Sequence, residues 1–115
     1  MKQRLLVMNG QRILQGESDG AWTSQKVDKA GTLKPGIYNI YTAEPVDKLQ
    51  RYDGVIVYAD KNSVYQQIGK KFVMHARQDF DIVPTYGSVK SISYNDHGKA
   101  VISSETAKLS RGRSR

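Results

Sequence analysis

Tyr65, His75 and Arg77 are the residues of this sequence best suited to chemistry on a phosphodiester, and they lie close together along the chain. Histidine exchanges protons near neutral pH, and an arginine fork holds phosphate oxygens. His75 would be the general base or acid, Arg77 the phosphate clamp and Tyr65 the orienting group. This arrangement defines one alternative for the chain, a small metal-free endoribonuclease.

Other catalytic and metal-binding patterns are missing from the sequence. A metal site from His75, Asp79 and Asp81 fits by spacing, but it offers a single nitrogen ligand and is not distinctive. The chain has no cysteine, no phosphate-cradling glycine loop and no nucleophile elbow. We therefore predict no catalytic residue, no metal and no cofactor, and a protein that is not an enzyme.

The same region is also suited to binding. Tyrosine can stack on a base, glutamine can read a base edge or a peptide backbone, and lysine and arginine attract phosphate. A more ordinary interpretation is that Tyr65 packs into the core, His75 caps a buried carbonyl and Arg77 pairs with Asp79 or Asp81. The predicted contact residues of this region are Tyr65, Gln66, Gln67, Lys70, Lys71, His75 and Arg77.

The C-terminal end concentrates positive charge. Residues 108–115 contain Lys108, Arg111, Arg113 and Arg115 and no acid, whereas residues 1–107 hold 14 Lys and Arg against 11 Asp and Glu, a net charge of +3. Gly112 and Ser114 give this segment little tendency to fold, so we expect a flexible basic tail that attracts DNA or RNA non-specifically.

Two hairpins are the clearest structural signals. Apolar runs flank Asn9-Gly10, the pair that best adopts a type I′ turn. Residues 89–94 and 99–103 flank a second polar turn at Asn95-Asp96-His97-Gly98. Further strands are expected at 21–27, 37–43, 54–59, 71–75 and 80–83.

Helical signals are short. Pro45 could open a helix that runs through Gln50, and the polar residues 60–63 could cap a helical turn over 64–68 that ends at Gly69. The sequence therefore predicts a mainly β, α+β fold, a small antiparallel sheet or part-open barrel with one or two short helices. We expect one domain over residues 1–107.

The composition also limits location. No apolar run approaches the ~20 residues that cross a bilayer, and the apolar stretch near the N-terminus is too short for a secretion signal. Without cysteine, a cytoplasmic protein that does not contact membranes is the simplest expectation. The sequence leaves the oligomeric state open.

The order of motifs between Leu33 and Phe80 resembles the KfrB domain. These motifs are 33–43 (LKPGIYNIYTA), 53–57 (DGVIV), 64–69 (VYQQIG), His75-Ala76-Arg77 and Asp79-Phe80, so we expect the KfrB-like region at about 33–83. The resemblance implies an accessory protein of conjugative plasmids and related mobile elements, acting in maintenance, partition or transfer. It also implies a plasmid-encoded protein partner, with no assigned active site. The leading hypothesis is therefore a non-enzymatic binding module for protein, DNA or RNA.

Overall fold

The computed structural model describes residues 2–104, which divide into two compact units. The N-terminal unit ends at Ala43 and the C-terminal unit begins at Glu44. Each unit is small, and small domains bury a smaller fraction of their surface than large ones, so each unit has only a small core of its own. One domain over residues 1–107 therefore stays a prediction, and the basic tail, residues 108–115, lies outside the described residues.

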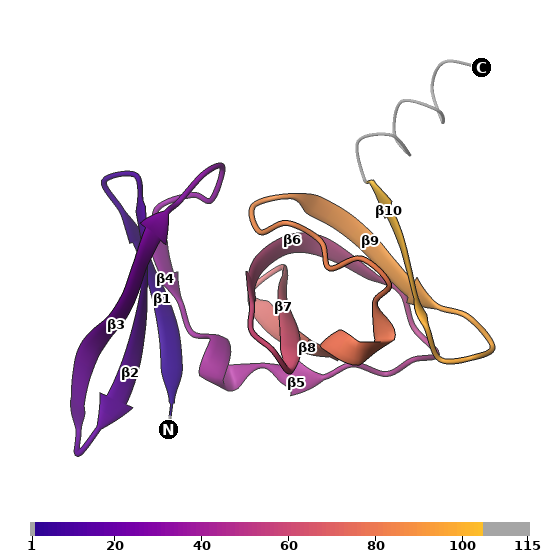
Figure 1. The fold of residues 1–115 in the computed structure, drawn as a ribbon, viewed down its shortest axis with the longest axis horizontal. Coiled ribbons are helices and arrows are strands. Elements are labelled where there is room, and N and C mark those ends of the chain that lie inside the picture. Colours follow the sequence, from indigo (N-terminus) through magenta and orange to yellow (C-terminus); the bar gives the residue numbers. More distant parts are fainter. Residues whose placement is uncertain (1, 105–115) are drawn as a thin grey trace. The chain divides into compact units, whose positions relative to one another are not determined.

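The N-terminal unit is a four-stranded antiparallel sheet in the order β3-β2-β1-β4 (Figure 1). Its strands are β1 (Gln3–Met8), β2 (Gln11–Ser18), β3 (Ala21–Lys29) and β4 (Gly36–Tyr38). Asn9 and Gly10 have φ of 52° and 76°, as a type I′ turn requires, and Asp19-Gly20 repeats this geometry between β2 and β3. The predicted first hairpin is confirmed.

The strand expected over residues 37–43 is wrong in extent. Pairing with β1 ends at Tyr38, and the chain turns into a short 3-10 helix, η1 (Ile40–Thr42). The hydroxyl of Tyr38 donates to the carbonyl of Lys34, and the hydroxyl of Thr42 donates to the carbonyl of Asn39. These local hydrogen bonds replace the ladder that a longer strand would need.

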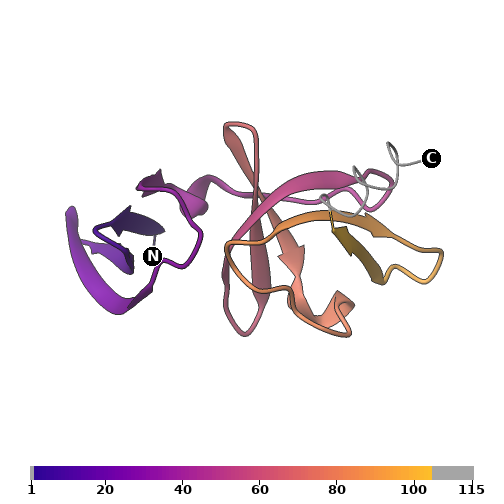
Figure 2. The same ribbon diagram turned by 90° about the horizontal axis from the view of Figure 1, so that it is seen from above.

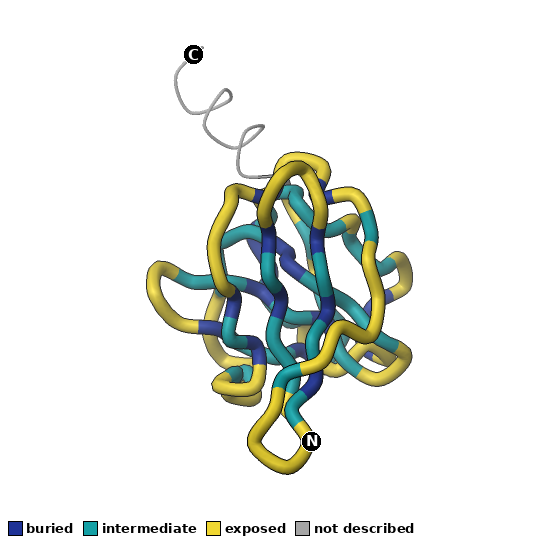
Figure 3. The backbone as a smooth tube through the Cα atoms, turned by 90° about the vertical axis from the view of Figure 1, so that its left-hand side faces the viewer, coloured by how far each residue is buried: buried dark blue, intermediate teal, exposed yellow. Residues whose placement is uncertain are grey.

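One face of this sheet forms a small core. Leu5, Leu14 and Tyr38 are cross-strand neighbours and all are buried. On the same face the buried Arg12 pairs with Asp28 at 3.2 Å. Buried and more exposed residues alternate along β1 and β2 (Figure 3), which separates a core face of this sheet from an open one.

The C-terminal unit is a six-stranded sheet in the order β10-β9-β6-β7-β8-β5. Its strands are β5 (Glu44–Pro45), β6 (Tyr52–Ala59), β7 (Ser63–Ile68), β8 (Lys71–Ala76), β9 (Val89–Tyr94) and β10 (Ala100–Ser104). Among these six strands, only β5 runs parallel to its neighbour, β8. The sheet curls strongly, but its outer strands β10 and β5 do not pair, so the barrel is not closed (Figures 1 and 2).

Three local expectations in this unit are wrong. Pro45 lies in β5 rather than at the start of a helix, residues 64–68 form β7 rather than a helical turn, and residues 80–83 are irregular. The second helix-like element is instead a 3-10 turn, η2 (Arg77–Asp79). The predicted hairpin at 95–98 is confirmed as the connection between β9 and β10.

A core cluster fills the curled sheet. It consists of Ile56, Val64, Phe80 and Ile92, with Tyr86 and Tyr94 among the half-buried residues around it. The predicted class, mainly β with little helix, is confirmed. None of the described helices is long and apolar enough to cross a membrane.

Gly54 lets β6 and β7 approach closely. A Cβ atom at this position would lie 1.9 Å from the carbonyl oxygen of Gln67, so Gly54→Ala must displace backbone. We expect it to lower the free energy of unfolding by about 3 kcal/mol, measured by urea denaturation. Gly69→Ala is the matched control, because nothing lies within 4 Å of its Cβ and its φ of +60° should cost only about 1 kcal/mol. Equal losses for the two variants would contradict the close approach.

Candidate binding site

The predicted contact residues 65–67 lie on a strand, which sends neighbouring side chains to opposite faces. Asp60 does accept hydrogen bonds from the backbone N–H groups of Asn62 and Ser63, at 2.8 and 2.7 Å. This is the chemistry of a helix cap, but here it closes the turn between β6 and β7. Gln66 consequently points into the curled sheet, while Tyr65 and Gln67 lie on the other face.

The buried Gln66 and His75 form a polar network with the half-buried Tyr94. Both Gln66 and His75 are 0% exposed. The amide nitrogen of Gln66 donates to the carbonyls of Tyr52, Gly54 and Lys90 at 3.0 to 3.2 Å. Its amide oxygen lies 2.8 Å from Nε2 of His75, and Nδ1 of His75 lies 2.6 Å from the hydroxyl of Tyr94.

This network fixes the protonation of His75. Carbonyl oxygens only accept, so the amide nitrogen of Gln66 must face them and its oxygen must face the imidazole. His75 therefore donates from Nε2, and as a neutral ring it accepts from Tyr94 at Nδ1. Burial lowers the pKa of His75 to about 4, against a smaller opposing effect of Asp79. Burial, then Asp79 and Tyr52, raises the pKa of Tyr94, so its hydroxyl keeps the proton that it donates.

Aromatic rings enclose the imidazole. Tyr52 and Phe80 meet His75 edge-on, with ring centroids 5.8 and 5.7 Å away. The nearby Asp79 is paired with Lys48 at 2.8 Å, and the same ammonium lies 5.4 Å from the Tyr94 ring. His75 therefore has partners at both ring nitrogens and no exposed surface on which to receive a ligand.

The other predicted contact residues do not join His75 on one surface. Arg77 lies beyond the end of β8, and its guanidinium donates to the carbonyl of Asp60 at 2.7 Å. Tyr65 stacks on Tyr58 at 6.0 Å, and Lys70 and Lys71 are exposed at the β7–β8 turn. Arg77 therefore lies in η2, outside the strand that carries His75. Lys108, Arg111, Arg113 and Arg115 lie outside the described residues.

The three residues whose spacing fits a metal site, His75, Asp79 and Asp81, have other partners. Asp79 pairs with Lys48, and Asp81 lies 3.7 Å from Lys99. Within residues 2–104, no three His, Asp or Glu side chains gather in a way that could hold a metal ion.

A cluster of cations and aromatic rings lies on the open face of the N-terminal sheet. The guanidinium of Arg4 lies 4.2 Å from the Trp22 ring centroid and donates to Gln15 at 2.8 Å. Trp22 meets Tyr41 at 6.0 Å, and the ammonium of Lys2 lies 5.2 Å from the Tyr41 ring. We call Lys2, Arg4, Trp22 and Tyr41 the aromatic–cation cluster. Sequence reasoning missed it, although the alternation of Lys2, Arg4 and Leu6 was a visible signal.

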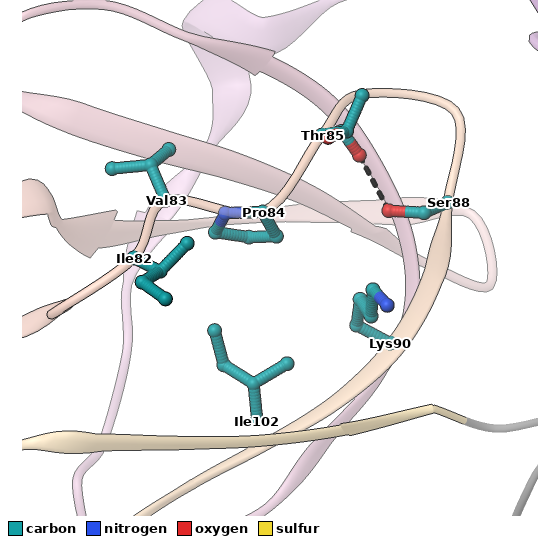
Figure 4. Close-up of a pocket in the computed structure, with 7 residues that line it drawn as sticks. All are labelled: Ile82, Val83, Pro84, Thr85, Ser88, Lys90 and Ile102. Atoms are coloured by element: carbon teal, nitrogen blue, oxygen red, sulfur yellow. Dashed lines mark hydrogen bonds between the residues drawn. The ribbon is translucent and has the colours of Figure 1, made fainter.

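The described residues of the C-terminal unit line at least two pockets. The larger, of about 360 Å³, is lined by Ile82, Val83, Pro84, Thr85, Ser88, Lys90 and Ile102 (Figure 4). In it Ser88 donates to the backbone of Thr85, and Lys90 is the single charged residue. The smaller, of about 290 Å³, contains the Lys48–Asp79 ion pair. Neither pocket lining includes the buried His75.

Two comparisons with known proteins bear on this arrangement. The family model described as KfrB Domain matches residues 51–104, a range that begins just before β6 and ends with β10. Protein TraB of Escherichia coli is 30% identical to this chain over 119 residues, covering 97% of this chain and 82% of that protein. The first match lies within the C-terminal unit, whereas the second spans residues of both units.

Gln66→Leu tests whether the buried amide holds the curled sheet together. The change leaves three backbone carbonyls and the Nε2–H of His75 without their partner, at about 1–3 kcal/mol for each buried group that stays unpaired. We expect a total loss of about 3 kcal/mol or more in urea denaturation. Gln67→Leu, the same change on the opposite face of β7, should cost less than about 1 kcal/mol. If Gln66→Leu were as mild as Gln67→Leu, the network would not carry stability.

The lowered pKa of His75 makes stability depend on pH. Between pH 6.5 and about 4 the unfolded chain binds a proton at this residue and the folded chain does not. The contribution of His75 to the free energy of unfolding is fully present above pH 6.5, and it falls by about 3 kcal/mol as the pH drops toward 4. Denaturation at several pH values checks this, with His97→Ala as a control because His97 is exposed. A folded-state pKa near 6.5 in an NMR titration of His75 would refute it.

Proposed function

Since this chain belongs to the KfrB-domain family of plasmid-associated proteins, we propose that it is a non-enzymatic accessory module that binds a protein or nucleic-acid partner. Its role would lie in the maintenance, partition or transfer of a plasmid or related mobile element. The proposal includes a cytoplasmic location, in keeping with a chain that lacks cysteine.

The aromatic–cation cluster is the observation that carries this proposal. Tryptophan, tyrosine and arginine supply much of the binding energy at protein interfaces, and they also stack on exposed bases. Gln15 and the Trp22 ring hold Arg4 in place, so little side-chain freedom remains to be lost on binding. Such a preorganised group on an open sheet face suits recognition.

The buried network supports the non-enzymatic part of the proposal. A general acid or base must reach the proton that it transfers, and both ring nitrogens of His75 are occupied by Gln66 and Tyr94. Arg77 is engaged with the backbone of Asp60. The endoribonuclease alternative thus finds no specific observation in its favour.

Removing residues 108–115 tests the nucleic-acid part. If its four cations all contact phosphates, the tail contributes a slope of about −3.6 to the dependence of log affinity on log salt concentration. Its share of the affinity then falls roughly 150-fold between about 50 and 200 mM salt. Fluorescence anisotropy with a labelled DNA and a labelled RNA measures the affinity of the full chain and of the shortened chain at each salt concentration.

Retention experiments from a plasmid-bearing host, with and without nuclease, separate protein partners from nucleic acid. Partners retained after nuclease support protein binding, and a salt slope that the deletion reduces supports ionic contact through the tail. No retained partner together with no affinity for DNA or RNA would overturn the proposed function. Cleavage of RNA in chelator that His75→Ala abolishes would show an enzyme instead.

A further inference from the structure

A row of aliphatic side chains crosses the open face of the N-terminal sheet. Leu6 pairs with both Ile13 and Ile37, and Ile13 pairs with Val27, so the row includes one residue from each strand. Val27 is 53% exposed and Ile37 is 57% exposed. Single exposed apolar residues are normal, but a contiguous row across four strands marks a contact surface.

Charges border this row, which we call the apolar row. Side-chain alternation places Met8 next to it, Lys2 and Arg4 toward one end of β1, and Lys29 toward the far end of β3. Glu17 is the one acid that the same alternation places on this face of β1 to β3. The face therefore has an aliphatic centre and a cationic, aromatic border, the usual organisation of a protein interface.

The residue types on the open face of the N-terminal sheet favour one kind of binding partner over others. Aliphatic side chains neither stack on bases nor hydrogen-bond to phosphates, so a central apolar row offers little to nucleic acid. A second copy of the same face would bring the Lys2, Arg4 and Lys29 charges of both copies together, which is unfavourable. An acidic protein segment with apolar side chains complements both the centre and the border.

We propose that this face, formed by the apolar row and the aromatic–cation cluster, docks an acidic protein segment that carries apolar side chains. The inference rests on the proposed function and names the class of protein partner. Leu6, Ile13, Val27 and Ile37 would receive the apolar side chains, and Arg4 and Lys2 would attract the carboxylates.

A short peptide of alternating Leu and Glu, with Pro at each end, is the probe for this surface. We expect it to bind the full chain and to shift the backbone amide NMR signals of β1, β2 and β3. Peptides that alternate Ser with Glu, or Leu with Lys, should bind at least about tenfold more weakly, since each lacks one half of the match. Oligodeoxythymidine supplies the nucleic-acid comparison.

Val27→Ser and Ile37→Ser remove apolar surface from the row without adding charge. We expect the double variant to weaken binding of the Leu–Glu peptide by about tenfold or more. The controls are Leu49→Ser and Ile82→Ser in the C-terminal unit. These two aliphatic side chains are 94% and 79% exposed. These should leave the affinity unchanged, and circular dichroism checks that each variant is folded.

Several results would overturn the docking surface. The first is that the Ser–Glu peptide binds as tightly as the Leu–Glu peptide, and the second is that the control variants lose as much affinity as the double variant. The third is that NMR shifts occur only in the C-terminal unit. The fourth is that oligodeoxythymidine displaces the peptide from the apolar row. The NMR map uses the unaltered chain, so it decides even if a variant misfolds. If the peptide experiments fail but partners are still retained after nuclease treatment, the docking surface is rejected and the proposed function stands.

Discussion

The amide group of Gln66 is the interaction on which the C-terminal unit depends. From β7 it reaches carbonyls on β6 and β9, and it accepts from His75 on β8. His75 in turn meets Tyr94 on β9 at 2.6 Å. In a flat sheet β8 and β9 would lie about 14 Å apart, three strand spacings, because β6 and β7 separate them. The His75–Tyr94 contact therefore requires the curl, and the curl encloses the network.

Burying these polar groups is costly unless each has a partner, which makes the network specific as well as stabilising. A shift of β7 by one residue would turn Gln66 outward and place Tyr65 or Gln67 against the imidazole. The three carbonyls would then lose their donor. Gly54 adds a second constraint, since only a residue without a Cβ admits the carbonyl of Gln67 at this point. Together they define the register of β6 and β7.

The sequence predicted the parts of the fold that depend on local chemistry. The Asn9-Gly10 and Asn95–Gly98 turns set two hairpins, because the left-handed backbone at Asn9, Gly10 and Gly98 favours those residue types. Long-range effects escaped prediction. The Asp60 carboxylate accepts hydrogen bonds from the next backbone N–H groups as a helix cap would. The residues that follow nevertheless form a strand, because they pair with β8. The sequence left it open whether Gln66 and His75 are buried, because their network includes Tyr94, which follows His75 by 19 positions.

The division between the two units gives a reason to look for specificity at the N-terminus. The KfrB model covers residues 51–104, where the curled sheet encloses its polar groups. The alignment with TraB covers 97% of the chain, so it must include residues of the N-terminal sheet as well. That sheet places the Arg12–Asp28 ion pair on its core face, and the apolar row and the aromatic–cation cluster on the other. Residues outside the core are freer than core residues to differ in type between relatives, and such differences allow different partners to be selected.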